Sequence, residues 1–282
     1  MRDTMKRTSA LLPALILCLG GTSVLFRLVQ PVEALYSVNQ PIVINADGSI
    51  TPSDAPINNV GDSTYTMTDD INITSSSSGI AIKRSDITLD GNGHTLTGLG
   101  LGGDGISLID GWANHVTVQN MTVVGFWDGI HLGTSSNNTI RGNSFSNCGG
   151  SLVVLGGSSN GNTIDKNNIT SGNYGVELFY YSSNNNFTRN YIANNRFWAI
   201  TLHLEAGNCT FYHNIVSGPV INDGPASTWD NGYPSGGNFW AGYISLDLYN
   251  GPYQNITGGD GIGDKAYLTA VSSTQIAIRL CW

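Results

Sequence analysis

One strand-like segment returns along this chain every 23 or 24 residues. In the runs 105–108 (GISL) and 129–132 (GIHL), apolar and polar residues alternate, which is typical of a strand with one buried face. The apolar anchors of five successive runs are Ile106, Ile130, Val153, Val176 and Ile200. Because a single coil cannot bury its own apolar face, the repeat predicts a solenoid in which several coils stack.

A second strand repeats in phase with the first. Its paired apolar positions are Val118 and Val123, Ile140 and Phe145, Ile164 and Ile169, and Phe187 and Ile192. Between them runs an asparagine column, in which Asn143, Asn167 and Asn190 share one offset and Asn92 has the same relation to Leu89. Stacked amides can bond to the backbone and to one another, and Asn tolerates left-handed corners. The two phases predict an all-β fold, a right-handed single-stranded parallel β-helix with coils of about 23 residues and an asparagine ladder.

Four regions follow from the pattern. Residues 1–34 are predicted to be a signal peptide or, alternatively, an uncleaved membrane anchor. They contain basic residues, an apolar run from Ala10 to Phe26 and a small-residue cleavage site at 32–34 (VEA). We expect residues 35–78 to lead into and cap the solenoid, 79–222 to form the β-helix, and 223–282 to form a cap module rich in Gly, Asn and aromatic residues. Export would place the protein outside the cytoplasm, secreted or on the cell surface.

Composition excludes some partners. Without residues 1–34 the chain keeps eight basic and 18 acidic residues, a net charge of −10 that would repel a phosphate backbone. We therefore expect no nucleic-acid partner, and contact with a membrane only through an uncleaved N-terminal segment. Cys148, Cys209 and Cys281 are odd in number and widely spaced, which argues against a disulfide framework or a zinc site.

The repeats resemble a known family. The segments 86–94 (DITLDGNGH) and 138–143 (NTIRGN) are similar to the parallel β-helix repeats of NosD-like proteins, also grouped as carbohydrate-binding and sugar-hydrolysis (CASH) domains. The segments 229–240 (WDNGYPSGGNFW) and 260–264 (DGIGD) resemble the C-terminal module of archaeal surface proteins of that family. The resemblance covers about residues 79–265 and implies a β-helix that binds or processes carbohydrate. The chain departs from the pattern after Asp264, where Lys265 and Ala266 replace an expected Thr-Pro.

The coil register also predicts one outer face. With the anchors inside, the positions one and three residues after them should face solvent on the same sheet. There His131, Glu177, Phe179 and His203 would form a polar and aromatic ligand-binding surface, with Trp198, Tyr180 and Tyr181 near its rim. Such a mixture suits a polysaccharide or cell-surface glycan. The alternative is an ordinary solvated face.

Asp104 and Asp128 precede the anchors on adjacent coils and are the candidate catalytic pair. Glycosidases use two carboxylates, and stacking supplies a suitable spacing. Both aspartates, however, stand in Asp-Gly-Ile at a corner, where Asp commonly serves turn geometry. The sequence favours the turn interpretation.

Two metal ions, Ca²⁺ and copper, are considered as possible ligands of the chain. Asp247, Asp260 and Asp264 offer oxygen ligands on a glycine-rich loop suited to Ca²⁺, although the loop is too short for an EF-hand. Copper, which the NosD resemblance implies, prefers His, Cys or Met. The histidines are dispersed and the chain after residue 34 has only two methionines, so the sequence does not support a copper site, and no cofactor is required.

Sequons for N-glycosylation begin at Asn72, Asn120, Asn137, Asn168, Asn186, Asn208 and Asn255. Three functions remain open. A surface carbohydrate-binding or structural β-helix explains every feature and comes first. The alternatives are a polysaccharide-active enzyme (glycoside hydrolase, lyase or epimerase) and a copper-associated accessory protein of the NosD type. A groove with converging side chains on the predicted face would favour an enzyme.

Overall fold

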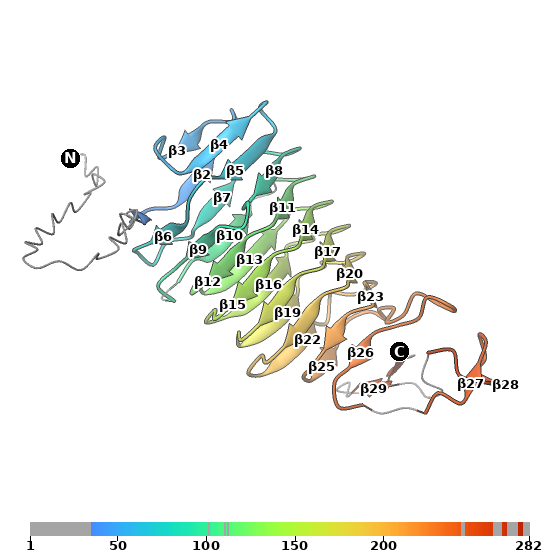
Figure 1. The fold of residues 1–282 in the computed structure, drawn as a ribbon. Helices are drawn as coiled ribbons and strands as arrows, with labels where there is room; N and C mark the ends of the chain where they lie inside the picture. The colour runs from blue at the N-terminus through green and yellow to red at the C-terminus, as the bar shows by residue number, and fades with distance from the viewer. Residues whose placement is uncertain are drawn as a thin grey trace, which may run out of the picture.

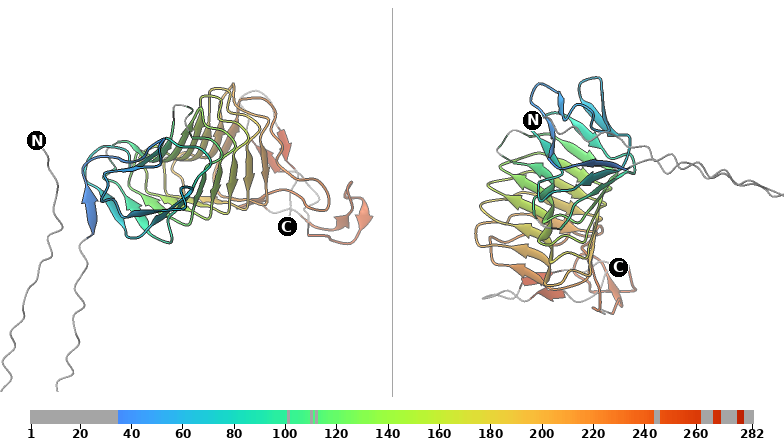
Figure 2. Two further views of the ribbon diagram at one scale, coloured as in Figure 1. Left: turned by 90° about the horizontal axis from the view of Figure 1, so that it is seen from above. Right: turned by 90° about the vertical axis from the view of Figure 1, so that its left-hand side faces the viewer.

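The computed structural model describes residues 35–100, 102–109, 111, 113–243, 246–261, 267–269 and 276–278. The predicted signal peptide or anchor, residues 1–34, lies outside them. Within the described residues the chain winds into stacked coils, and most strands fall into three sheets that run along the stack (Figure 1). Figure 2 shows the coils from two further directions, as one elongated solenoid.

The strands of each sheet are given in their order across the sheet. Sheet A comprises β1 (Tyr36–Val38), β6 (Ile71–Ile73), β9 (Thr95–Thr97), β12 (Thr122–Val124), β15 (Ser144–Ser146), β18 (Asn168–Thr170), β21 (Tyr191–Ala193), β24 (Ile215–Val216) and β26 (Phe239–Trp240). Sheet B comprises β25 (Val220–Asn222), β22 (Trp198–Leu202), β19 (Tyr174–Leu178), β16 (Ser151–Gly156), β13 (Asp128–Gly133), β10 (Asp104–Leu108), β7 (Ile80–Ile82), β2 (Ile42–Ile44) and β3 (Ile50–Thr51). Sheet C comprises β23 (Thr210–Tyr212), β20 (Asn186–Thr188), β17 (Thr163–Asp165), β14 (Thr139–Arg141), β11 (Thr117–Gln119), β8 (Thr88–Asp90), β5 (Thr64–Met67) and β4 (Ile57–Val60). Two further hairpins are formed by β27 (Tyr249–Asn250) with β28 (Ile256–Thr257), and β29 (Tyr267–Thr269) with β30 (Ile276–Ile278).

The predicted anchors stack in one interior column. In sheet B, Ile106 pairs with Ile130, and the pairing continues in parallel through Val153 and Val176 to Ile200. All five side chains are fully buried. Ile80 and Val220 extend the column by one strand at each end. The β-helix predicted from the repeat is therefore confirmed.

Sheets A and C supply the other interior columns. In sheet C the predicted positions Val118, Ile140, Ile164 and Phe187 are register partners, and Phe211 continues them. Phe187 and Phe211 stack with ring centroids 4.5 Å apart. Repeated burial of large apolar side chains provides the main stabilisation of such a stack.

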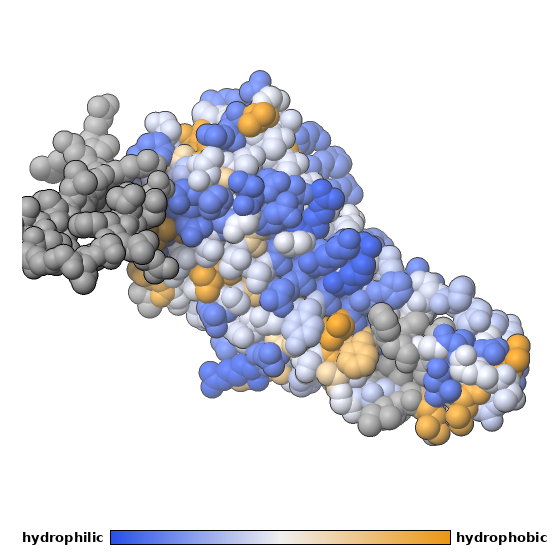
Figure 3. All heavy atoms as spheres, in the orientation of Figure 1, coloured by the Kyte–Doolittle hydropathy of each residue, from blue (hydrophilic) through white to orange (hydrophobic). Residues whose placement is uncertain are grey.

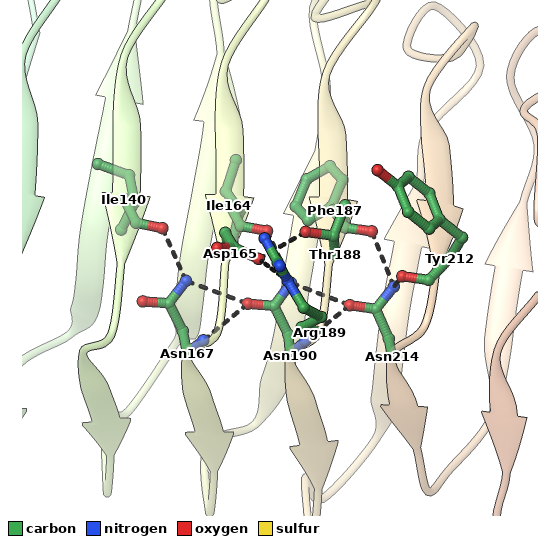
Figure 4. A network of polar contacts seen from close by, with 10 residues as sticks. All are labelled: Ile140, Ile164, Asp165, Asn167, Phe187, Thr188, Arg189, Asn190, Tyr212 and Asn214. Carbon is green, nitrogen blue, oxygen red and sulfur yellow. Dashed lines mark hydrogen bonds and ion pairs between the residues drawn. The ribbon is translucent and has the colours of Figure 1, made fainter. Parts of the chain in front are cut away.

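An asparagine ladder closes the corner between sheets C and A (Figure 4). Asn167 donates from Nδ2 to the carbonyl of Ile140 at 2.8 Å and accepts the backbone N–H of Asn143 at 3.0 Å. Asn143 and Asn190 make the same bonds one coil earlier and later, and the column continues through Asn214 and Asn238. All five are buried, so the amides satisfy backbone groups that water cannot reach.

At four of the five ladder corners, those of Asn143, Asn167, Asn190 and Asn214, the left-handed residue is the one before the asparagine, rather than the asparagine itself. Gly142, Lys166, Arg189 and His213 have φ values between 55° and 64°. The amide is therefore kept for hydrogen bonding, and the preceding residue makes the turn.

Asn92 is not part of the ladder, contrary to the expectation from its offset to Leu89. Its side chain is exposed, and its backbone N–H bonds to Asp90 in a local turn. The reason is a longer connection, because four residues separate β8 from β9 where two separate β14 from β15. Gly91 instead lies beneath Met121, so closely that a side chain there would collide with Met121.

Two further polar columns line the corner between sheets B and C. Asn138 and Asn162 each accept a backbone N–H from the preceding coil, at 2.8 Å, and Asn185 continues the column. The hydroxyl of Ser159 accepts the N–H of Ser135 in the same way. These residues are buried and were not singled out from the sequence.

The solenoid reaches beyond the boundaries expected for it. β1, β2, β5 and β6 already belong to the three sheets, and β26 pairs with β24 at the far end. Short strands and hairpins obscure the repeat in residues 35–78, where β3 and β4 run antiparallel to their neighbours and cover the first coil.

Among the described residues, no helix is long and apolar enough to cross a membrane. The face in Figure 3 is mostly hydrophilic along the coils, and hydrophobic residues gather over the C-terminal segment that carries β27 and β28. Leu248 and Ile256 are exposed there.

Candidate functional site

The outer face of sheet B brings the predicted surface residues together. His131 lies on β13, Glu177 on β19, and Phe179 and His203 directly follow β19 and β22. The Phe179 ring lies edge-on between the two histidines, with its centroid 6.4 Å from that of His131 and 6.2 Å from that of His203. The three rings therefore form one row across four coils.

Part of the outward column of sheet B is almost buried. Val154, Ser107 and Thr201, expected to face solvent, are at most 5 % exposed. The larger His131 and Glu177 are the register partners of Val154 on the adjacent strands and stand on either side of it. Phe179 covers Gly156 so closely that a side chain at Gly156 would displace the ring.

Glu177 is the polar centre of one end of the face. Its Oε1 lies 2.8 Å from Nε2 of His203, and its Oε2 accepts the hydroxyl of Ser151 at 2.6 Å. A groove borders it, lined by Glu177, Phe179, Tyr180, His203, Leu204, Glu205 and Asp223. Tyr180 and Leu204 are among the most exposed apolar side chains, so the groove offers both charged and apolar surface.

Asp104 and Asp128 lie at the other end of the face. They are register partners on β10 and β13, and one oxygen of each lies within 4.8 Å of the other and of a ring nitrogen of His131. The glycines that follow them are required by packing, because a side chain at Gly129 would collide with the carbonyl of Leu152. The Asp-Gly corners expected from turn chemistry thus also converge on His131.

The surroundings of the two aspartates differ. Asp128 accepts the N–H of Ser151 at 2.7 Å, and His131 Nδ1 lies 3.5 Å from Asp104. Burial, with added repulsion from Asp104 and Glu177, raises the pKa of Asp128 to about 6, against the opposing effects of the Ser151 N–H and His131. Burial works to lower the pKa of His131, but the hydrogen bond and charge of Asp104 outweigh it and raise that pKa.

Trp127 is a neighbour of this pair that sequence reasoning missed. Its side chain is 54 % exposed and lies against Gly149 and Gly150, where any side chain would meet the indole. At Gly150 a side chain would also meet the Asp128 carboxylate. The Gly-Gly pair in 148–151 (CGGS) was the available signal.

The raised pKa of Asp128 leads to a prediction about the stability of the folded chain. Below pH 3.8, its ordinary pKa, the carboxyl is protonated in both the folded and the unfolded chain. As the pH rises through 6 the folded chain must hold a buried carboxylate, so a stabilising contribution of roughly 3 kcal/mol is lost. Asn stays neutral and keeps an oxygen for Ser151. We expect Asp128→Asn to be more stable than the wild type by roughly 2–3 kcal/mol at pH 7.5, and by none of this at pH 3.5, in urea unfolding.

Asp86→Asn is the matched control, because Asp86 also faces a histidine, His115 at 3.5 Å, but in an exposed pair. Its effect should stay within about 0.5 kcal/mol at both pH values. A difference for Asp128→Asn that does not change with pH would contradict the assigned cause.

The expected calcium ligands lie in a hydrogen-bonded turn. The two oxygens of Asp247 accept the backbone N–H groups of Asp260 at 3.0 Å and Gly261 at 2.9 Å, and Asp260 accepts the side-chain amide of Gln254. Asp264 lies outside the described residues. Calcium binding stays a prediction. Within the described chain, Asp104, Asp128 and His131 form a group of three possible metal ligands. The expectation of no copper site stays a prediction.

The sequons occupy surface positions to different degrees. Those at Asn120, Asn137, Asn168, Asn208 and Asn255 are exposed, and those at Asn72 and Asn186 are half-buried. Asn120, Asn137 and Asn208 have left-handed φ values and stand at coil corners. Glycosylation stays a prediction.

Two solved structures with a similar course are a single and a double mutant of the tailspike protein of E. coli bacteriophage HK620, each in complex with a pentasaccharide. Each shares 13 % identity and covers 65 % of this chain and 41 % of its own, with TM-scores of 0.35 and 0.28. The chain thus spans less than half the length of these tailspikes. No curated protein matches the sequence.

A family profile matches a continuous stretch of the chain. The profile described as "Right handed beta helix region" matches residues 57–238, which is well over half of the chain and includes every coil that carries the outer face of sheet B. The chain belongs to the right-handed β-helix family.

Proposed function

We propose that this protein is an exported, NosD-like β-helix protein that binds a polysaccharide on the outer face of sheet B. One observation carries the proposal: the Phe179 ring, the Glu177 carboxylate and the His203 ring line one groove, and the His131 ring packs edge-on against Phe179. A sugar ring has an apolar face that stacks on aromatics and hydroxyls that need directional hydrogen bonds, so this pairing of groups suits it.

The charge of the groove favours a neutral polysaccharide. Its lining includes the carboxylates of Glu177, Glu205 and Asp223 and no Lys or Arg. Carboxylates accept hydrogen bonds from sugar hydroxyls but repel uronate or sulfate groups. The signal-like segment 1–34 and the NosD-like repeats support export to the cell exterior or surface.

Binding should depend on the aromatic row. We expect Phe179→Ala to weaken binding to a neutral polysaccharide by about tenfold or more, because the ring provides stacking surface worth roughly 1–3 kcal/mol. Affinity electrophoresis in gels that contain dextran, mannan, galactomannan, arabinoxylan or mixed-linkage β-glucan would measure the change. Polygalacturonate and alginate serve as acidic comparison polymers.

Tyr191→Ala is the matched control, because Tyr191 is an exposed aromatic on sheet A, on another face of the solenoid. It should leave the retardation unchanged. Equal loss in both variants, or retardation by the acidic polymers alone, would count against the proposed face. Retardation by none of the polymers would remove the proposal.

A further inference from the structure

The groove beside Glu177 is acidic as well as aromatic. Glu177, Glu205 and Asp223 contribute carboxylates to its lining, and the described residues that line it include no Lys or Arg. The histidine of the lining is His203, whose Nε2 lies 2.8 Å from Oε1 of Glu177. Because carboxylates outnumber basic groups, the groove has a negative potential that attracts a cationic ligand.

Two aromatic rings in the groove add to this attraction. The rings of Phe179 and Tyr180 are perpendicular, at 89°, with centroids 4.8 Å apart, so their faces point in two directions. The face of an aromatic ring carries the negative part of its quadrupole and attracts a cation. Tyr180 is 64 % exposed, so its ring is open to a ligand. Ring faces and carboxylates together suit an ammonium group better than an uncharged group.

The backbone at the edge of the groove displays two tyrosines at a cost. Tyr180 and Tyr181 both have left-handed φ values, 50° and 63°, which bulky residues rarely adopt. The same corner one coil earlier is made by Gly157 and Ser158, also with left-handed φ values, so the turn itself does not require aromatic residues. Strain of this kind is concentrated at ligand sites. The hydroxyl of Tyr181 donates to the Glu205 carboxylate at 3.0 Å and so orients it.

The carboxylates of the groove are spread out rather than gathered around one point. Among the described residues, the three possible metal ligands with atoms within 4.8 Å of one another are Asp104, Asp128 and His131, at the other end of the face. Carboxylates spread along a groove match several charges along a polymer better than one metal ion. Amino groups on successive sugars present charges in this way, and an ammonium group donates stronger hydrogen bonds to a carboxylate than a hydroxyl does.

We propose that the groove prefers a polysaccharide of amino sugars with unsubstituted, protonated amines to its neutral counterpart. The inference rests on the proposed function, because it names the class of sugar that the same groove binds. A sugar ring stacks on Phe179, and the ammonium groups pair with Glu177 and Glu205 and face the ring of Tyr180. Neutral polysaccharides share the stacking but lack the ionic contacts.

Calorimetric titration of the full chain at pH 5.5 tests this preference. The ligands are a β-1,4-linked glucosamine tetramer with free amines and its fully N-acetylated counterpart, which has the same backbone without the charge. We expect the free-amine tetramer to bind more tightly by about tenfold or more, through ion pairs and cation–π contacts. The difference should shrink in about 0.5 M NaCl, because salt screens exposed charges.

Substitutions at Leu204 separate the charge of the groove from its shape. Leu204 lines the groove and is 77 % exposed, so a polar side chain is tolerated there. Leu204→Lys should weaken binding of the free-amine tetramer by about fivefold or more through repulsion, whereas Leu204→Gln, the matched control, should change it by less than about twofold. Glu205→Gln should also weaken it. Asp86→Asn removes one negative charge outside the groove and should leave it unchanged.

The outcomes separate this preference from binding itself. Equal or weaker affinity for the free-amine tetramer, or binding of neither tetramer by a chain that a neutral polymer retards in the gel, overturns the amino-sugar inference and leaves the binding proposal standing. Unchanged affinity in Leu204→Lys would place the amine site elsewhere and also overturn it. A lysine tetrapeptide that binds as tightly as the free-amine tetramer would assign the groove to cations in general, with the same consequence. Binding of neither tetramer, together with retardation by none of the polymers, removes both proposals.

Discussion

Replacing Asn167 by alanine is expected to lower the free energy of unfolding by roughly 3–5 kcal/mol, although the change removes only one amide. The Ile140 carbonyl loses its donor, and the Asn143 N–H loses its acceptor. Both groups are buried, so no water replaces the amide, and each unsatisfied group costs about 1–3 kcal/mol. The side-chain bonds to Asn143 and Asn190 in the same column are lost as well.

Asn168 is the matched control. It is the next residue, is exposed, and makes only a long side-chain contact to Ser144, at 3.4 Å. Asn168→Ala should change the free energy of unfolding by less than about 0.5 kcal/mol in urea titrations. Similar losses for both variants would mean that the ladder adds little to the stability of the corner.

The second large effect is expected at the C-terminal end of the interior column. Phe211 stacks between Phe187, at 4.5 Å, and Trp229, at 4.4 Å between ring centroids, and all three side chains are buried. Phe211→Ala removes both stacks and leaves a cavity, so we expect a loss of roughly 3–5 kcal/mol. Because each coil contacts mainly its neighbours, the loss should be local.

Amide hydrogen exchange measures where that loss falls. Exchange should accelerate in β20, β23 and β24 and remain slow in β8 and β11, several coils away. Tyr212→Ala is the control, because Tyr212 is the adjacent residue but is only half-buried. Acceleration spread evenly over all coils would show that the solenoid unfolds as one unit and would contradict local stabilisation.

The repeat predicted the architecture because all of its apolar positions recur for one physical reason, burial in the shared interior. Ile106 and Ile200 lie four coils apart but share a column, since every inward position must meet the same interior. The ladder was predicted where the corner has a constant length, at Asn143, Asn167 and Asn190. The prediction was wrong at Asn92, because a longer turn there shifts the register. A sequence offset does not reveal such an insertion.

The residues of the candidate site could be predicted from the sequence, but the burial of their side chains could not. The register placed His131, Glu177, Phe179 and His203 on one face, and the structure brings them together. The burial of Asp128 could not be predicted, because it arises from neighbours on other coils that close around the carboxylate. Trp127 was missed for the same reason, since its position depends on the space left by two glycines one coil later.

The two ends of the solenoid differ in kind from its middle. At the N-terminal end, β3 and β4 are the edges of sheets B and C and run against the direction of the other strands, so these two edges do not offer the parallel register that another copy would need for end-to-end growth. The edge of sheet A is β1, which is parallel to its neighbour. Interior coils, by contrast, have interchangeable contacts above and below. Gene duplication or deletion of whole coils on the N-terminal side of β10 would then change the length of the rod while leaving both ends and the face of β10 to β22 intact.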